Sequence, residues 1–404
     1  MNERTKGAWI FHHQNKLREL EEHDFDNIEA AGNTGKLLSG LVASDEESRL
    51  GPEKVKVIAK GAGVTKDALP VVLDRLKAHQ LIDVSSSGEV VALGLTTASV
   101  LEHTAGMFLE LEPTIKEKAS LLLAEEISAE PVKESLMKEL VSDTYKLKGA
   151  EALEIIQQSE VAGLIDVEQV EDQRLLFNGN LFKSDVIKKT TKVLDSLNPK
   201  ERGALMSIDA EIAQAGCITF EKAEKIAGRL LLEKVQSVGL YDFSEVSNPY
   251  DSKFFVTKPA SFAKYGRPFE EDALDYAKAL VASLSYGINY SDRMRGRIDL
   301  LPWLLRALID GREVGPAPAI GQDYHYLESK NVVAVRREGS RFYMRLLKKE
   351  VGELAYQVMQ RGDASETSLM QSGVNITGYQ MVLGNYAHGI AEFSTYLQTT
   401  AGEL

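Results

Sequence analysis

Apolar and polar positions follow one pattern four times along the chain. Each time a helical run ends, a short apolar strand follows, and a polar loop leads into a second strand. The first strands start 83, 76 and 92 residues apart, at Leu81, Leu164, Leu240 and Val332. The second strands are predicted at Glu89–Leu95, Arg174–Leu181, Lys253–Lys258 and Arg341–Leu347. A divergent module used four times explains this pattern better than four unrelated helix-to-strand junctions.

The residue before each first strand is placed to end a helix. Gly163 and Gly239 can adopt the left-handed conformation of a C-terminal cap without a steric penalty, and Asn331 tolerates it best after glycine. Gln80 holds the same position in the first copy. Apolar residues at helical spacing precede each cap, and we expect three of them to be core residues: Leu76, Ile156 and Val235.

The first copy contains a further helix at Pro52–Lys60, closed by Gly61-Ala62-Gly63. The order helix, turn, helix and two-stranded wing over Val55–Leu95 resembles the winged helix-turn-helix superfamily, without pointing to a specific family within it. The resemblance implies a DNA-binding or protein-docking scaffold, and the fold alone does not choose between them. The predicted fold class is mainly α with small β wings (α+β), an array of three or four winged-helix modules joined by helices.

Six segments follow from this pattern. Long helical stretches are expected to join the copies at Ala98–Glu126 and Val186–Gly216. The tail Ser365–Leu404 is expected to form a helix docked on the body, with a homodimer contact as the alternative. The predicted segments are 1–34 (N-terminal helical segment), 35–100 (module 1), 101–183 (module 2), 184–290 (module 3), 291–362 (module 4) and 363–404 (C-terminal helical tail).

Composition narrows the class of protein. The 404 residues are 44% hydrophobic and 26% charged, as in a globular protein, and no apolar run reaches the length needed to span a bilayer. The first residues lack the apolar centre of a signal peptide. The single cysteine, Cys217, excludes an internal disulfide, so a cytoplasmic protein without a membrane contact is expected.

Motifs of catalysis and cofactor binding are missing from the sequence. It contains no phosphate loop, Rossmann glycine fingerprint, nucleophile elbow or zinc-binding spacing. Asp83, Asp166 and Asp242 recur in the first strands, but they are better explained as solvent-facing or wing-bonding residues. His12-His13 has no nearby cysteine to complete a metal site. We therefore predict no catalytic, metal-binding or cofactor-binding residue, and no cofactor.

Charge is distributed unevenly along the chain. The net charge of −13 argues against a protein that coats nucleic acid generally, because phosphate neutralisation by Lys and Arg supplies most nonspecific affinity. Module 2 is acidic, with 17 acidic and 7 basic residues between Leu101 and Leu175. Between Tyr290 and Glu350 the balance reverses to 12 basic and 8 acidic residues. The candidate nucleic-acid-binding residues lie here: Arg293, Arg295, Arg297, Arg336, Arg337, Arg341 and Arg345.

Three functions are compatible with these observations. The first is a non-catalytic winged-helix adaptor or regulatory subunit that binds protein partners in a cytoplasmic, DNA-handling assembly and touches nucleic acid through module 4. The second is a sequence-specific DNA-binding transcriptional regulator acting as a dimer. The third is an enzyme whose site has no local motif. The acidic helix of module 2, with Glu151, Glu154 and Glu160, favours the first over the second, because it would repel phosphate.

Overall fold

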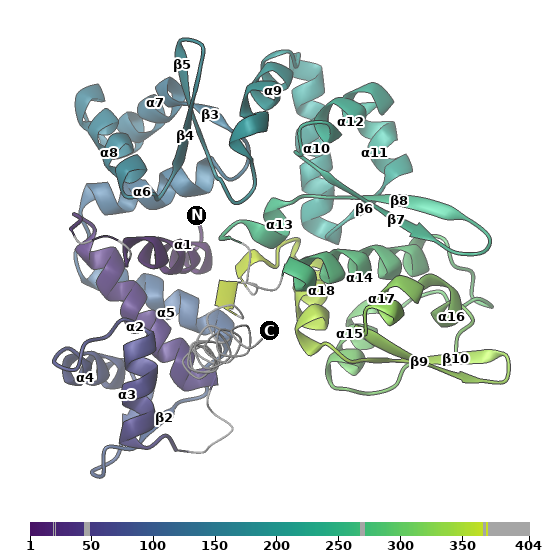
Figure 1. The fold of residues 1–404 in the computed structure, drawn as a ribbon, viewed down its shortest axis with the longest axis horizontal. Helices are drawn as coiled ribbons and strands as arrows, with labels where there is room; N and C mark the ends of the chain where they lie inside the picture. The colour runs from purple at the N-terminus through teal and green to yellow at the C-terminus, as the bar shows by residue number, and fades with distance from the viewer. Residues whose placement is uncertain (19, 21, 44–48, 267–270, 367–368, 371–404) are drawn as a thin grey trace, which may run out of the picture.

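The computed structural model describes residues 1–18, 20, 22–43, 49–266, 271–366 and 369–370 (Figure 1). The described part of the chain is mainly helical, with 57% of its residues in helices, and its strands form small antiparallel sheets. It begins with α1 (Glu3–Leu17), and four repeats of one order of elements follow. That order is a helix, a short strand segment, two helices, a hairpin and a closing helix.

Repeats 1 and 2 lie together at one end of the molecule (Figure 1). Repeat 1 contains α2 (Asp26–Ala43), α3 (Pro52–Gly61), α4 (Leu69–Ala78), β1 (Ile82–Val84), β2 (Val90–Ala92) and α5 (Thr97–Glu110). Repeat 2 contains α6 (Ile115–Glu126), β3 (Val132–Lys133), α7 (Glu134–Tyr145), α8 (Gly149–Val161), β4 (Asp166–Val170), β5 (Gln173–Phe177) and α9 (Ser184–Asp195).

Repeats 3 and 4 lie at the opposite end (Figure 1). Repeat 3 contains α10 (Pro199–Ala215), β6 (Ile218–Thr219), α11 (Phe220–Ala227), α12 (Arg229–Gln236), β7 (Asp242–Ser247), β8 (Ser252–Thr257), α13 (Ala260–Ala263) and α14 (Glu271–Asn289). Repeat 4 contains α15 (Leu301–Ile309), α16 (Ile320–Asp323), α17 (His325–Ser329), β9 (Val333–Glu338), β10 (Arg341–Leu346) and α18 (Lys349–Arg361).

All four predicted hairpins are confirmed, and they belong to four separate sheets. In each repeat, a short extended segment that the sequence pattern did not predict also pairs with the second strand of the hairpin. This segment lies after the first helix of the repeat. The four pairings are Leu50 with Val90, Val132 with Leu176, Ile218 with Val256, and Val314 with Met344.

The helix caps are confirmed and share one hydrogen-bond pattern. Gln80, Gly163, Gly239 and Asn331 all have positive φ, between 53° and 71°. In each repeat the next N–H donates to a carbonyl five residues earlier, as in a Schellman motif. The four bonds measure 3.0, 2.9, 3.2 and 2.9 Å and end on the carbonyls of Leu76, Ser159, Val235 and Leu327.

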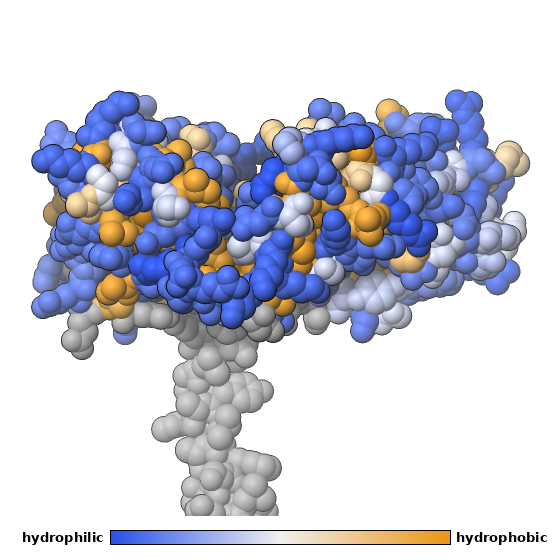
Figure 2. Space-filling model, turned by 90° about the horizontal axis from the view of Figure 1, so that it is seen from above, coloured by the Kyte–Doolittle hydropathy of each residue, from blue (hydrophilic) through white to orange (hydrophobic). Residues whose placement is uncertain are grey.

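Apolar side chains gather into four cores. One core lies around repeat 1 and α1, one within repeat 2, one around repeat 3 and α9, and one joins α14 to repeat 4. The predicted core residues Leu76, Ile156 and Val235 are fully buried. Seen from the side of repeats 2 and 3, the outer surface is largely hydrophilic with scattered apolar patches (Figure 2).

The two long helical stretches predicted between copies are each two helices. Pro113 follows the end of α5, and Thr114 then caps α6 with Glu117 in a capping box. Asn198 caps α10 in the same way after α9 has ended. The second helix of each pair is the first helix of the next repeat, so repeat 2 starts at Ile115, inside the segment predicted as module 2 (101–183), and repeat 3 starts at Pro199, inside the segment predicted as module 3 (184–290).

The last described residues pack against α1 and repeat 1. Glu366 forms a 2.7 Å ion pair with Arg4 and accepts a hydrogen bond from the Thr5 hydroxyl. Met370 is buried in the core of repeat 1. The predicted tail helix and the homodimer contact concern mainly residues 371–404, which lie outside the described residues. None of the helices described is long and apolar enough to cross a membrane.

Candidate nucleic-acid interface

The hairpin of repeat 4 separates its residues onto two faces. Val333, Met344 and Leu346 are buried on the inner face. The outer face carries three cross-strand pairs, which are Arg341 with Glu338, Tyr343 with Arg336, and Arg345 with Ala334. Strand alternation therefore brings three of the candidate arginines together on one exposed surface.

Arg336 is already paired. Its guanidinium donates to both carboxylate oxygens of Glu313, at 3.0 and 2.8 Å, and to Glu338 at 3.1 Å. It also lies 4.3 Å from the ring centroid of Tyr343. The hydrogen bonds from Arg336 hold the pKa of the Glu313 carboxyl below its usual value. Arg341 and Arg345 are exposed and form no salt bridge with a described residue.

Arg337 lies on the inner side of the hairpin tip. Its Nε donates to the carbonyl of Gly339 at 2.8 Å, and its guanidinium lies 5.7 Å from the ring centroid of Phe342. The side chain remains exposed to solvent. Arg337 therefore lies on the opposite face of the hairpin from the three outer arginines.

Arg295 forms an internal ion pair. It bonds to the carboxylate of Asp323, donates to Ser291 at 2.9 Å and Gln322 at 3.2 Å, and lies 5.2 Å from the ring of Tyr286. The Asp323 side chain is 1% exposed. Burial raises the pKa of that carboxyl, although the hydrogen bond from Arg295 opposes the shift. All these contacts hold Arg295 inside the fold.

Arg293 and Arg297 flank this ion pair on the surface. Both are exposed, and Arg297 lies 3.6 Å from Asp299. The structure therefore divides the seven candidate arginines into an outer hairpin face, a neighbouring exposed pair, the hairpin-tip residue and one internal residue.

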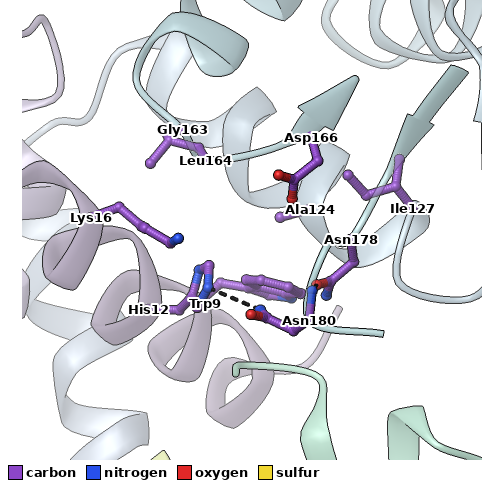
Figure 3. Close-up of a pocket in the computed structure, with 10 residues that line it drawn as sticks. All are labelled: Trp9, His12, Lys16, Ala124, Ile127, Gly163, Leu164, Asp166, Asn178 and Asn180. Carbon is purple, nitrogen blue, oxygen red and sulfur yellow. Dashed lines mark hydrogen bonds between the residues drawn. The ribbon is translucent and has the colours of Figure 1, made fainter. Parts of the chain in front are cut away.

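The small cavity in Figure 3 lies where α1 meets repeat 2. Its volume is about 20 Å³, enough for one water molecule. Trp9 donates from its indole to Glu125 at 2.7 Å, and Asp166 accepts from the backbone N–H of Gly179 at 2.8 Å. Asp166 thus bonds the end of its own hairpin, as one of the sequence-based explanations predicted. The site is a polar joint between helices and is too small for a substrate.

His12 and His13 lie beside this joint. Both are buried, their Nδ1 atoms are 3.3 Å apart, and His13 Nε2 is 3.4 Å from the carbonyl oxygen of Ser120. Burial lowers the pKa of both, that of His13 to about 4. Within the described residues, no group of three His, Cys, Asp or Glu side chains is arranged to hold a metal ion.

A second basic surface was missed by the sequence reasoning. Lys188, Lys189 and Lys192 of α9 and Lys234 of α12 line one open groove. Their separation along the chain conceals this arrangement, because α9 closes repeat 2 whereas α12 belongs to repeat 3. The α9 spacing alone could have shown that three lysines share the polar side of an amphipathic helix.

Comparisons of the chain with protein-family models, with curated proteins and with solved structures find no match.

Proposed function

We propose that the protein is a tandem winged-helix adaptor that binds protein partners in a cytoplasmic, DNA-handling assembly and makes nucleic-acid contacts of its own. The observation that carries this proposal is the order of elements in every repeat. A helix, a short strand, two helices and a hairpin follow one another, and the short strand pairs with the second hairpin strand. This is the order expected of a winged-helix module.

The proposed nucleic-acid contact is the outer face of the hairpin in repeat 4. Arg341 and Arg345 are exposed there and have no salt-bridge partner among the described residues, so their guanidinium groups are free to bind phosphate. Arg336 must exchange its bonds to Glu313 for phosphate, which lowers its contribution. Arg293 and Arg297 extend the same proposal to the preceding loop.

Two of the four helices that precede a hairpin, α8 and α17, favour an adaptor over a sequence-specific regulator. In α8, Glu154 is exposed and Glu160 pairs with Arg174. In repeat 4, α17 has only five residues, His325–Ser329, and contains no Lys or Arg. Neither helix offers the cationic side chains that commonly read guanine in a major groove. Contact with the nucleic-acid backbone is therefore the favoured mode.

The test is a fluorescence-anisotropy titration of duplex and single-stranded oligonucleotides at several salt concentrations. We expect the wild-type protein to bind without strong sequence preference. Changing Arg336, Arg341 and Arg345 together to Ala should weaken binding and reduce the slope of log K against log salt by up to about one unit for each phosphate that is no longer bound. The Glu154→Ala variant is the control and should bind at least as well as wild type. Absence of binding by the wild type at low salt would refute the nucleic-acid part of the proposal.

A further inference from the structure

The groove between α9 and α12 has a defined chemical character. Its volume is about 400 Å³, and it is lined by four lysines together with Val193 and Ser196. The apolar stems of the lysines contribute to its walls, while long cationic side chains of this kind keep their ammonium groups in solvent. The groove therefore combines an apolar floor with a cationic rim.

Packing fixes the direction of the α9 lysines. Ile187 and Leu194 belong to the core around repeat 3 and α9, and Thr190 is also buried, whereas Lys188 and Lys192 are exposed. Lys189 donates from Nζ to the carbonyl of Ser237 at 3.1 Å, joining α9 to the end of α12. The cationic rim is thus a consequence of how the two repeats join.

The charges on the rim are poorly neutralised within the protein. Lys234 lies 3.9 Å from Glu201, and Lys192 lies 3.9 Å from Glu171, at the limit of an ion pair. Exposed pairs of this kind contribute little stability. Lys188 has no salt-bridge partner among the described residues. By contrast, Arg336 in repeat 4 makes short bonds to two carboxylates.

We infer that this groove binds the sugar–phosphate backbone of a nucleic acid, an inference that rests on the proposed function for its class of ligand. An open groove rimmed by flexible ammonium groups can follow successive phosphates, each of which is attracted as a point charge. The groove offers no buried donor that would enclose a single small anion. The lysines, and not only the hairpin arginines, then supply the nonspecific affinity of the protein.

The test compares two triple variants of the full chain in which the same number of positive charges is removed. The groove variant carries Lys188→Gln, Lys192→Gln and Lys234→Gln, and Lys189 is retained because it joins the helices. The control variant carries Lys60→Gln, Lys146→Gln and Lys330→Gln, three exposed positions outside the groove. A fluorescent 20-base-pair duplex is titrated by anisotropy at several salt concentrations. We expect the groove variant to bind about 10- to 100-fold more weakly at low salt, with a salt slope reduced by up to about three units and the control near wild type.

Lysine acetylation of the wild-type protein gives a second measurement that does not depend on the variants. The duplex should protect Lys188, Lys192 and Lys234 and leave Lys60, Lys146 and Lys330 reactive. Wild-type binding of the duplex with equal affinities for the two triple variants, or with no protection of the groove lysines, would overturn the inference and leave the proposed function standing. Protection of the groove lysines by polyglutamate but not by the duplex would likewise overturn only the inference about the groove. No duplex binding by the wild type at low salt would overturn both nucleic-acid statements.

Discussion

The carboxylate of Glu117 accepts hydrogen bonds from the backbone N–H of Asn27 at 2.7 Å and from its side-chain amide at 3.0 Å, across 90 residues of sequence. The same carboxylate accepts from Thr114 and from the N–H of Ile28. One buried side chain therefore caps α6 and α2 together, and it joins repeat 2 to repeat 1. Negative charge at two helix N-termini is favourable because it compensates the unpaired N–H groups there.

Replacing Glu117 should destabilise the N-termini of both α2 and α6. We expect Glu117→Ala to lower the free energy of unfolding by about 2–4 kcal/mol, because several buried donors lose a charged acceptor. Glu126→Ala, at an exposed position on the same helix, is the control and should change stability little. Urea denaturation followed by circular dichroism measures both. Equal stability of the two variants would show that the double cap is unimportant.

At the helix caps, replacing a glycine with alanine and replacing Gln80 with glycine should change stability in opposite directions. A Cβ atom at Gly163 or Gly239 would meet no atom within 4 Å, so only the left-handed backbone opposes a side chain. Gly163→Ala should destabilise the protein by about 1 kcal/mol, whereas Gln80→Gly should stabilise it by about 0.5–1 kcal/mol. Differential scanning calorimetry of the two variants checks the signs. A lower melting temperature for Gln80→Gly would contradict the shared cap.

Core burial can be tested within one short helix. Val235 is fully buried in α12, whereas Leu230 of the same helix is 69% exposed. Val235→Asp buries an unpaired charge and should cost about 3–5 kcal/mol, while Leu230→Asp should stay near wild type. Thermal melts give the comparison directly. An unchanged melting temperature for Val235→Asp would refute its place in the core.

The Arg295–Asp323 pair predicts a structural phenotype for one of the candidate arginines. Arg295→Met leaves the Asp323 carboxylate buried without its partner and should cost about 3–5 kcal/mol. The double variant Arg295→Met with Asp323→Leu should recover much of that stability. Below its melting temperature, this double variant should bind an oligonucleotide like the wild type. Weaker binding by the folded double variant would give Arg295 a direct role at the interface.

Acid should destabilise the joint between α1 and repeat 2. The pKa of His13 is lowered from 6.5 to about 4, so the unfolded chain binds its proton first as the pH falls. Stability should therefore be undiminished above pH 6.5 and decrease between about pH 6.5 and 4, by about 3 kcal/mol from this residue. A His13→Gln variant should lack that part of the pH dependence. Parallel slopes for the two proteins over this interval would contradict the assignment.

The sequence predicted the hairpins and caps because each depends on local residues. Strand alternation and a left-handed cap leave a signal within about 20 residues, as at Gly239 and the strands after it. The pairings of Leu50 and Val314 involve one residue each and therefore have no periodicity to detect. Likewise, the groove lysines and the Arg295–Asp323 pair meet only after distant segments pack. Local chemistry was thus readable from the sequence, whereas contacts set by packing were not.

The return of the last described residues to the first repeat has a consequence for synthesis on the ribosome. The core around Trp9 includes Tyr265 and Met370, which are translated long after α1 has emerged. Repeat 1 can start to collapse early, but its apolar core is complete only after Met370 has been synthesised. A repeat made before the other three is therefore completed after them.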